Sequence, residues 1–418
     1  MHQRLATLAI VILGIACALP ARAADLTPAA ETALQRVLDG GRDSHSDAVL
    51  VLKDGKELAH HYRGGTPPGP IELMSATKSV VALGIGQLIG QGRIRSLDQP
   101  MADFYPEWKQ GRKRDITVRM LLNHTSGLQN VPMAPAEIYP APDAVQLALA
   151  AELDHAPGQQ FSYNNKATNL LAGIIAKASG KPMDVFFRDG LFAELGVVPG
   201  AWDKDPAGNP YAMAGLPLTA VDAAKIGQLV LDRGKWRGKQ LVPAEYIETM
   251  LSPGQSLDPS CGLLWWLRPA WMHFSFDPDS LAMLRERGVS ADLVATLGRT
   301  LAGAQFDGPN AVMAGLSERL GEDASRIRDE LIGEHKIGPY RLFKIERGPV
   351  AAYEAQGYLG QYIVVVPSAG LVAVRQIAAP PGDGAQPESD PYGDFTQRVL
   401  ELAVAMGDLP APPAVPAP

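Results

Sequence analysis

The stretch IELMSATKSVVALGIGQLIGQGRI, from Ile71 to Ile94, decides the fold of this chain. It carries an S-x-x-K motif, Ser75 to Lys78, and nearly every position after the motif is apolar or small. A helix that is apolar on all sides is a buried helix. Because glycine is costly in a helix interior, the glycines here indicate that neighbouring elements pack closely against it. The stretch therefore predicts a buried helix that begins near Ser75.

The motif itself has a chemical and a structural interpretation. Residues three apart share a helix face, so the Ser75 hydroxyl and the Lys78 amine lie side by side. A lysine in a dry site loses proton affinity and can help take the serine proton, while a helix N-terminus offers N–H groups to a forming anion. A helix-capping serine followed by a solvated lysine would give the same motif. The motif alone therefore does not distinguish a catalytic pair from a structural helix start, and other motifs in the chain are needed.

Length and composition are those of an ordinary globular protein. The length of 418 residues and the mass of 44.5 kDa suggest one large domain or two closely packed domains. The net charge is −7 and no basic run stands out, so a nucleic-acid partner is not expected. The eight histidines show neither H-x-H nor H-E-x-x-H spacing, so neither a metal nor another cofactor is expected.

The first 23 residues read as a secretory signal peptide. A basic start at Arg4 is followed by an apolar run and by Ala21-Arg22-Ala23, which predicts cleavage before Ala24 and a periplasmic or secreted protein. The run is too short to be a stable membrane span, and a lipoprotein processed at Cys17 is the alternative. After cleavage Cys261 is the remaining cysteine, so we expect no internal disulfide and a buried thiol.

Strand and helix patterns divide the chain into a sheet region and a helical region. A hairpin is expected from residue 48 to 62, and strands recur towards the C-terminus at Tyr340–Glu346, Ala352–Gln356, Gln361–Val366 and Gly370–Gln376. The predicted division is a sheet region of residues 24–70 and 215–408, an all-helical region of 71–214, a helical insertion of 278–335 that could be a lid, and a mobile tail of 409–418.

Two further motifs give the Ser75–Lys78 pair its context. Tyr163-Asn164-Asn165 follows 88 residues after Ser75, and Ala355-Gln356-Gly357 lies on a late strand just before Tyr358. With phrases such as LLNHTSGL (121–128) and FSYNNKATNLLAGII (161–175), the chain resembles the serine β-lactamase and penicillin-binding-protein-like family. Its nearest members are class C β-lactamases, D-alanyl-D-alanine carboxypeptidases, and esterase and nylon-oligomer-hydrolase-like enzymes.

The resemblance implies an α+β fold of the β-lactamase/transpeptidase type, in which a five-stranded antiparallel sheet flanked by helices lies beside an all-helical region. It implies that Ser75 is the nucleophile, Lys78 its activator and Tyr163 a general base or proton relay. It also assigns Asn165 to orienting substrate and Lys78. The oxyanion would be held by the N–H groups of Ser75 and Tyr358, beside Gln356 and Gly357. His124, in a polar turn, is interpreted as structural.

One departure from the family pattern affects the expected substrate. The third motif is often K-T-G, whose lysine and threonine bind a carboxylate, whereas this chain has Ala355-Gln356-Gly357. Alanine cannot replace the charge, although Arg341 or Lys344 on a neighbouring strand could supply it. The prediction is a secreted serine hydrolase of small ester, amide or peptide-like molecules. A β-lactamase or D-alanyl-D-alanine carboxypeptidase is the alternative, and a non-catalytic penicillin-binding or sensor-like domain is the alternative of another class.

Overall fold

The computed structural model describes residues 26–131, 133–321, 323–379 and 392–413. The predicted signal peptide and the end of the predicted tail lie outside these residues. Among the described residues, no helix combines the length and the apolar character that crossing a membrane requires.

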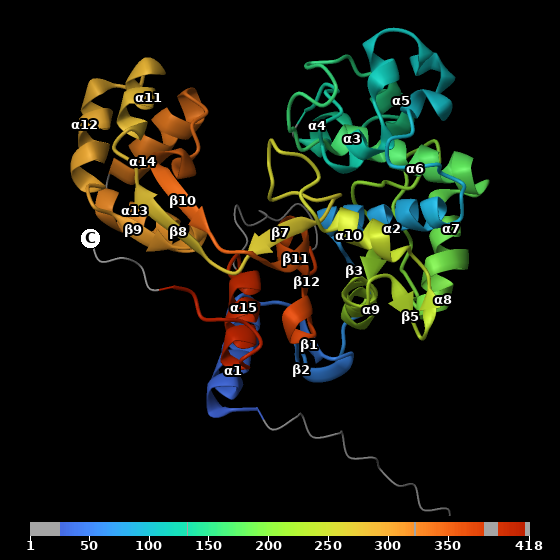
Figure 1. Ribbon diagram of the computed structural model, residues 1–418, viewed down its shortest axis with the longest axis horizontal. Helices are drawn as coiled ribbons and strands as arrows, with labels where there is room; N and C mark the ends of the chain where they lie inside the picture. Colours follow the sequence, from blue (N-terminus) through green and yellow to red (C-terminus); the bar gives the residue numbers. More distant parts are fainter. Residues whose placement is uncertain (1–25, 132, 322, 380–391, 414–418) are drawn as a thin grey trace, which may run out of the picture.

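The centre of the fold is an antiparallel sheet of six strands in the order β2-β1-β13-β12-β11-β7 (Figure 1). The strands are β1 (Ala48–Lys53), β2 (Lys56–Tyr62), β7 (Trp266–Pro269), β11 (Val350–Gly357), β12 (Gln361–Val366) and β13 (Leu371–Gln376). The expected fold class is confirmed, but the expected count of five strands is wrong, because β7 pairs with β11 and adds an edge strand. The predicted strand Tyr340–Glu346 belongs to another sheet.

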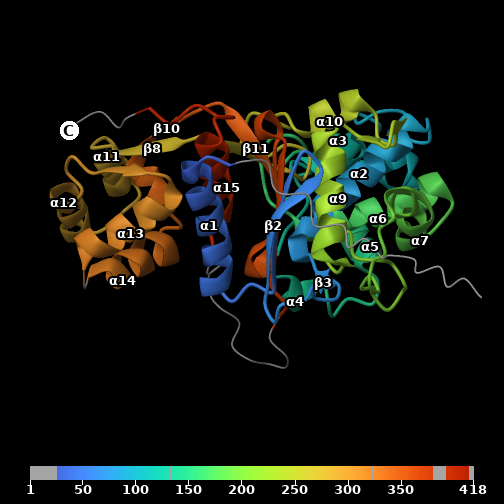
Figure 2. The same cartoon turned by 90° about the horizontal axis from the view of Figure 1, so that it is seen from below.

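Helices cover both faces of this sheet. One face packs on α1 (Pro28–Asp43) and α15 (Phe395–Ala405), and the other faces α9 (Ala220–Leu231) and the central helix α2 (Thr77–Gly90), as Figures 1 and 2 show from two directions. The alternation of side chains along a strand explains this arrangement. In β12, Ile363 points into the core on the α9 side and Val364 into the core on the α15 side.

The helical region surrounds α2, which is buried over most of its length, as the sequence predicted. A Cβ on Gly84 would lie 2.4 Å from the ring of Phe187, and one on Gly86 would lie 2.3 Å from the ring of Tyr246. The two glycines are therefore needed for close packing. The other helices here and beside the sheet are α3 (Val118–Leu122), α4 (Ala134–Glu137), α5 (Ala144–Ala150), α6 (Asn165–Ser179), α7 (Met183–Phe187), α8 (Ala193–Leu195) and α10 (Ala244–Met250).

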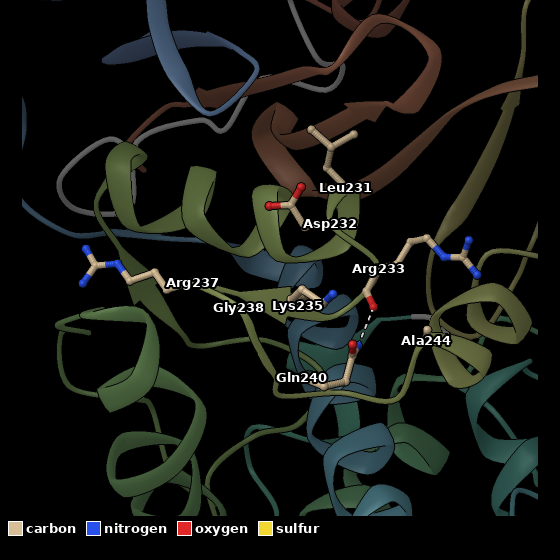
Figure 3. Close-up of a pocket in the computed structure, with 8 residues that line it drawn as sticks. All are labelled: Leu231, Asp232, Arg233, Lys235, Arg237, Gly238, Gln240 and Ala244. Atoms are coloured by element: carbon tan, nitrogen blue, oxygen red, sulfur yellow. Dashed lines mark hydrogen bonds between the residues drawn. The ribbon is translucent and has the colours of Figure 1, made fainter.

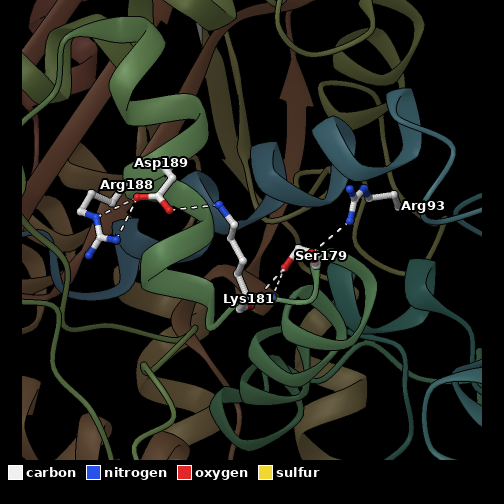
Figure 4. Close-up of polar contacts among 5 residues, drawn as sticks. All are labelled: Arg93, Ser179, Lys181, Arg188 and Asp189. Carbon is white, nitrogen blue, oxygen red and sulfur yellow. Dashed lines mark hydrogen bonds and ion pairs between the residues drawn. The ribbon is translucent and has the colours of Figure 1, made fainter.

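The turn between α6 and α7 is tied together on the surface (Figure 4). Ser179 accepts a hydrogen bond from Arg93 through its carbonyl oxygen, at 3.0 Å, and Lys181 forms an ion pair with Asp189, also at 3.0 Å. Asp189 also pairs with its neighbour Arg188. Exposed pairs of this kind contribute little stability each, so the buried faces of these helices are what hold the region together.

The insertion forms a module with a core of its own. It consists of α11 (Ser280–Glu286), α12 (Ala291–Thr300), α13 (Pro309–Leu320) and α14 (Asp323–Ile327), together with a sheet of β8 (Met272–Phe276), β9 (Gln305–Asp307) and β10 (Phe343–Arg347). The three strands were missed or assigned to the main sheet, because strand spacing does not identify a strand's partner. The chain enters and leaves through the β7–β8 and β10–β11 connections, and Figure 2 shows α1 and α15 between the module and α2.

A surface pocket of about 420 Å³ lies between the end of α9 and the hairpin of β5 (Lys235–Trp236) and β6 (Lys239–Gln240) (Figure 3). Gln240 closes one side by donating a hydrogen bond to the carbonyl oxygen of Arg233 at 2.7 Å. Arg233 also pairs with Glu248, which balances part of the basic charge. Within the part of the chain that the structure describes, this pocket shares no lining residue with the cavity beside Ser75.

Candidate active site

Ser75 lies in a single 3-10 turn, Met74–Ala76, which leads directly into α2. The preceding residue, Met74, has a φ of 49°, in the left-handed region that a non-glycine residue adopts at a cost. The backbone just before this turn is held in place, because the N–H of Leu73 donates to the carbonyl oxygen of Leu216 at 2.9 Å. The short strands β3 (Ile71–Glu72) and β4 (Pro217–Leu218) pair beside it. The backbone is thus held in a strained turn that presents the Ser75 hydroxyl.

Lys78 is placed against Ser75 in the way the motif predicts. Its ammonium donates to Ser75 Oγ at 2.9 Å and to the carbonyl oxygen of Met213 at 2.7 Å. The residue is only 3% exposed. Burial lowers the pKa of Lys78, and interaction with Tyr163 partly opposes that shift. An amine with lowered proton affinity in contact with a hydroxyl is suited to accept the proton of that hydroxyl.

Tyr163 lies on the loop before α6, with its ring centre 5.0 Å from Lys78 Nζ. Two aromatic rings fix its orientation: Trp266 lies parallel with ring centres 6.3 Å apart, and His124 is tilted with ring centres 4.6 Å apart. The Tyr163 backbone is also held, since Asn130 donates a hydrogen bond to its carbonyl oxygen at 2.8 Å. The Lys78 ammonium therefore contacts the Ser75 hydroxyl and lies beside the ring of Tyr163, a residue that is distant from both in the sequence.

His124 is closer to this site than its structural interpretation implied. It is buried, lines the cavity with Ser75, and accepts a hydrogen bond from the Asn164 N–H at Nδ1, at 3.3 Å. Burial, reinforced by the Lys78 charge, lowers the pKa of His124 to about 3, so the imidazole is neutral. A neutral ring held in one tautomer supports Tyr163 without adding charge. Sequence spacing carries no signal for this contact, because the turn that holds His124 meets Tyr163 only in space.

The third motif reaches the nucleophile turn through Gly357, the last residue of β11. A Cβ on Gly357 would lie 2.2 Å from the carbonyl oxygen of Leu73 and 3.0 Å from Met74 Cβ. Its φ of −129° is ordinary, so close approach alone requires glycine here. Tyr358 follows with a side chain that is 53% exposed. The strand end and the Ser75 turn are therefore in direct backbone contact.

The cation beside the third motif is neither Arg341 nor Lys344. Both belong to the insertion module, where Lys344 lies 3.5 Å from Asp277. Arg268 of β7 is the cation that contacts the motif: its Nη2 donates to Gln356 Oε1 at 3.1 Å and to Glu354 Oε1 at 2.6 Å. Glu354 is fully buried, whereas the Arg268 side chain is 32% exposed. Arg268 was overlooked because it stands 88 residues before Gln356 in the sequence.

Asn165 is the first residue of α6, and its Oδ1 is buried with no hydrogen-bond partner among the described residues. The second acceptor for Lys78 is Met213, not Asn165. Cys261 also lines the cavity; burial, followed by the charge of Asp258, raises its thiol pKa to about 12, so the thiol is inert. Free space in the cavity is about 10 Å³, near the minimum for one water.

Among the described residues, none of the insertion module lines this cavity, which is formed by Ser75, Lys78, Ser79, His124, Tyr163, Cys261, Leu264, Trp266 and Gln356. Three parts of the chain contribute to it: the start of α2, the loops of the helical region, and the edge of the sheet at β7 and β11. Such junctions between structural regions are common places for binding sites.

Comparison with known proteins finds relatives that match part of this chain. The chain is 27% identical over 229 residues to 6-aminohexanoate-dimer hydrolase of Paenarthrobacter ureafaciens. The aligned region covers 50% of this chain and 58% of that protein. It is 28% identical over 176 residues to the D-alanyl-D-alanine-carboxypeptidase/endopeptidase AmpH of Escherichia coli K12, covering 38% of this chain and 46% of that protein. The chain therefore matches only about half the length of these curated relatives.

Solved structures show the same fold over nearly the whole chain. A putative 6-aminohexanoate-dimer hydrolase from Bacillus anthracis superposes with a TM-score of 0.58 at 19% identity, covering 89% of this chain and 82% of that one. A putative β-lactamase from Bacteroides dorei superposes with a TM-score of 0.61 at 18% identity, covering 89% and 98%. The model of the family described as Beta-lactamase matches residues 34–391, and this chain belongs to that family.

Proposed function

We propose that this protein is an exported serine hydrolase that cleaves a small ester or amide through an acyl-enzyme. The observation that carries the proposal is the 2.9 Å contact between Lys78 Nζ and Ser75 Oγ, made by a buried ammonium whose pKa is lowered. A solvated lysine at a helix start would show neither burial nor that shift. Export rests on the N-terminal sequence alone.

The proposed reaction follows from the neighbours of Ser75. The Ser75 oxygen attacks the substrate carbonyl while its proton passes to the Lys78–Tyr163 pair, which acts as one proton-sharing unit. The oxyanion is stabilised by the backbone N–H groups of Ser75 and Tyr358, a contribution of about 3 kcal/mol per donor. The pair returns the proton to the leaving group, and water then hydrolyses the ester formed on Ser75.

The names of the relatives favour an amide bond in a small molecule. One relative is named for a dimer of 6-aminohexanoate and another for a carboxypeptidase, and both names describe hydrolysis of a compound built from amino acids. A β-lactamase or D-alanyl-D-alanine carboxypeptidase activity is the second candidate. The exposed edge of Arg268 beside Gln356 favours a substrate that carries a carboxylate, since a guanidinium fork matches that group.

The direct test is intact-mass analysis after incubation with a fluorophosphonate, with a series of p-nitrophenyl esters, and with a penicillin. We expect one covalent fluorophosphonate adduct on Ser75 and turnover of short esters, with penicillin hydrolysed slowly or not at all. Rapid penicillin turnover would favour the β-lactamase alternative. A folded sample that is not labelled by any of the probes would favour a non-catalytic binding domain.

Arg268 gives a prediction about substrate choice. Arg268→Gln alone would leave the buried Glu354 carboxylate without its cationic partner, although Thr396 still donates a hydrogen bond to it, at a cost of about 3–5 kcal/mol, so the informative variant is Arg268→Gln with Glu354→Gln. We expect kcat/KM for an ester ending in a carboxylate to fall about 10- to 100-fold, the effect of one lost charge-assisted bond. The uncharged ester of equal length should change little.

For each variant, kcat/KM for the carboxylate ester is divided by kcat/KM for the uncharged ester. This ratio is compared between the double variant and a control, Arg347→Gln, which changes an exposed arginine of the module. Equal losses on both esters would show that the arginine supports the strand without contacting a substrate carboxylate.

A further inference from the structure

The turn that joins β11 to β12 has an unusual conformation. Leu359 has a φ of 67° and Gly360 a φ of 84°, so two successive residues lie in the left-handed region. A leucine is disfavoured there, and this one is buried. A strained, buried turn persists only where its surroundings hold it. The turn directly follows Tyr358, whose N–H is the proposed second oxyanion donor.

Arg375 of β13 holds this turn. Its side chain is 0% exposed, and Nη1 donates to the carbonyl oxygens of Leu359 at 2.8 Å and Gly360 at 2.7 Å. Nε donates to Ser46 Oγ at 2.8 Å, and the guanidinium carbon lies 5.7 Å from the Tyr392 ring centre. Ser46 and Tyr392 therefore help to fix the orientation of the guanidinium plane, in addition to its bonds with the turn. Hydrogen bonds from a charged donor are stronger than neutral ones.

The backbone of Tyr358 is constrained on both sides along the chain. The bonds from Arg375 hold the residues after it, and the close packing of Gly357 holds the residue before it. Gly357 pairs with Gln361 across the turn and lies against the Leu73 backbone, while Arg375 holds the Leu359–Gly360 and Gly360–Gln361 peptide groups, which begin one residue after Tyr358. The direction of the Tyr358 N–H then follows from the chain on each side of it. Because arginine stays protonated at all working pH values, this constraint does not vary with pH.

We propose that Arg375 is a positioning residue for the oxyanion hole: its buried guanidinium fixes the Leu359–Gly360 turn and thereby aims the Tyr358 N–H at the reacting carbonyl. The inference rests on the proposed function, since it needs an acyl-transfer reaction at Ser75. Arg375 itself lies on the face of the sheet that packs on α1 and α15, with the core residues Leu371 and Ala373, so it acts through the turn and not on the substrate.

The test uses Arg375→Lys, which keeps the charge but has a single nitrogen in place of the fork. We expect kcat for a p-nitrophenyl ester to fall about 10- to 100-fold, because one misplaced oxyanion donor has an effect of up to that order. KM should stay within about threefold, since ground-state binding does not use the hole. The Ki of phenylboronic acid, whose serine adduct places an oxygen in the hole, should rise in parallel with the loss in kcat.

The matched control is Arg398→Lys. Arg398 contacts the same ring, 5.1 Å from the Tyr392 centre, but donates to the Arg36 carbonyl and to Asp394 instead of the turn. It should leave kcat and the boronate Ki unchanged. If Arg375→Lys does not fold, Ser46→Ala removes the acceptor of Nε and the contact of Ser46 Oγ with Ser44 Oγ, and it should give the same parallel change in kcat and Ki on a smaller scale.

Unchanged kcat in a folded Arg375→Lys variant would overturn the inference, as would a loss of kcat and melting temperature with no change in the boronate Ki. Fluorophosphonate labelling of the wild-type protein separates the two proposals. If Ser75 is labelled and the variant is fully active, the inference about Arg375 fails alone. If the wild-type protein is not labelled, the proposed function fails.

Discussion

Replacing Lys78 with methionine is expected to lower kcat/KM for a p-nitrophenyl ester by about 1,000-fold or more. General-base assistance is worth roughly 10²–10⁴-fold, and Lys78 is the cation that contacts Ser75 Oγ. The fold should survive, because methionine has a similar length and removes a buried charge. The measurement is ester turnover together with the melting temperature, compared with Ser75→Ala as the inactive reference and Lys177→Met, an exposed lysine of α6, as the control.

The pH profile adds a second measurement to this prediction. The ammonium form of Lys78 cannot accept the serine proton, so activity requires the pair to have lost a proton. Because burial lowers the pKa of Lys78 from 10.5, kcat/KM should rise with pH along a limb below that value and then level off. A limb near 10.5, or a Lys78→Met variant with nearly full activity, would show that another group activates Ser75.

Replacing Gly357 with alanine is expected to lower kcat/KM by about 100-fold, the size of effect that a displacement of about 1 Å produces in a catalytic arrangement. The added methyl would stand 2.2 Å from the Leu73 carbonyl oxygen, and neither backbone can yield without moving β11 away from Ser75. Overpacking of this kind also destabilises a protein by about 1–3 kcal/mol. Enzyme assays and denaturant titrations measure the two effects separately.

The control for this variant is Gly69→Ala, in the loop that precedes β3. A Cβ at Gly69 would have no atom within 4 Å and its φ is not in the left-handed region, so activity and stability should both be retained. If Gly357→Ala were as active as the wild-type protein, the contact between β11 and the nucleophile turn would not be needed for catalysis.

The sequence predicted the parts of the site that depend on local pattern. Ser75 and Lys78 could be identified because the helix period puts them on one face, and the apolar run after them marked a buried helix. The glycines of α2 indicated close packing, and the rings of Phe187 and Tyr246 provide it.

What the sequence could not predict depends on partners that are distant in the chain. Strand spacing did not show that Tyr340–Glu346 would pair inside the module, nor that β7 would add a sixth strand to the main sheet. Arg268 is separated from Gln356 by the whole module, so its contact with that residue could not be read from the sequence. His124 was interpreted as part of a turn, and its contact with Tyr163 arises only from the packing of two loops.

The rings that press on the glycines of α2 have a consequence for how this protein could change. No side chain larger than hydrogen fits at Gly84 or Gly86 while Phe187 and Tyr246 stay in place, so the middle of α2 has little tolerance for mutation. Changes in substrate selectivity are easier to make at the sheet edge, where Trp266 lines the cavity and Arg268 contacts Gln356. A laboratory search for altered selectivity should therefore randomise these sheet-edge positions and leave the helix unchanged.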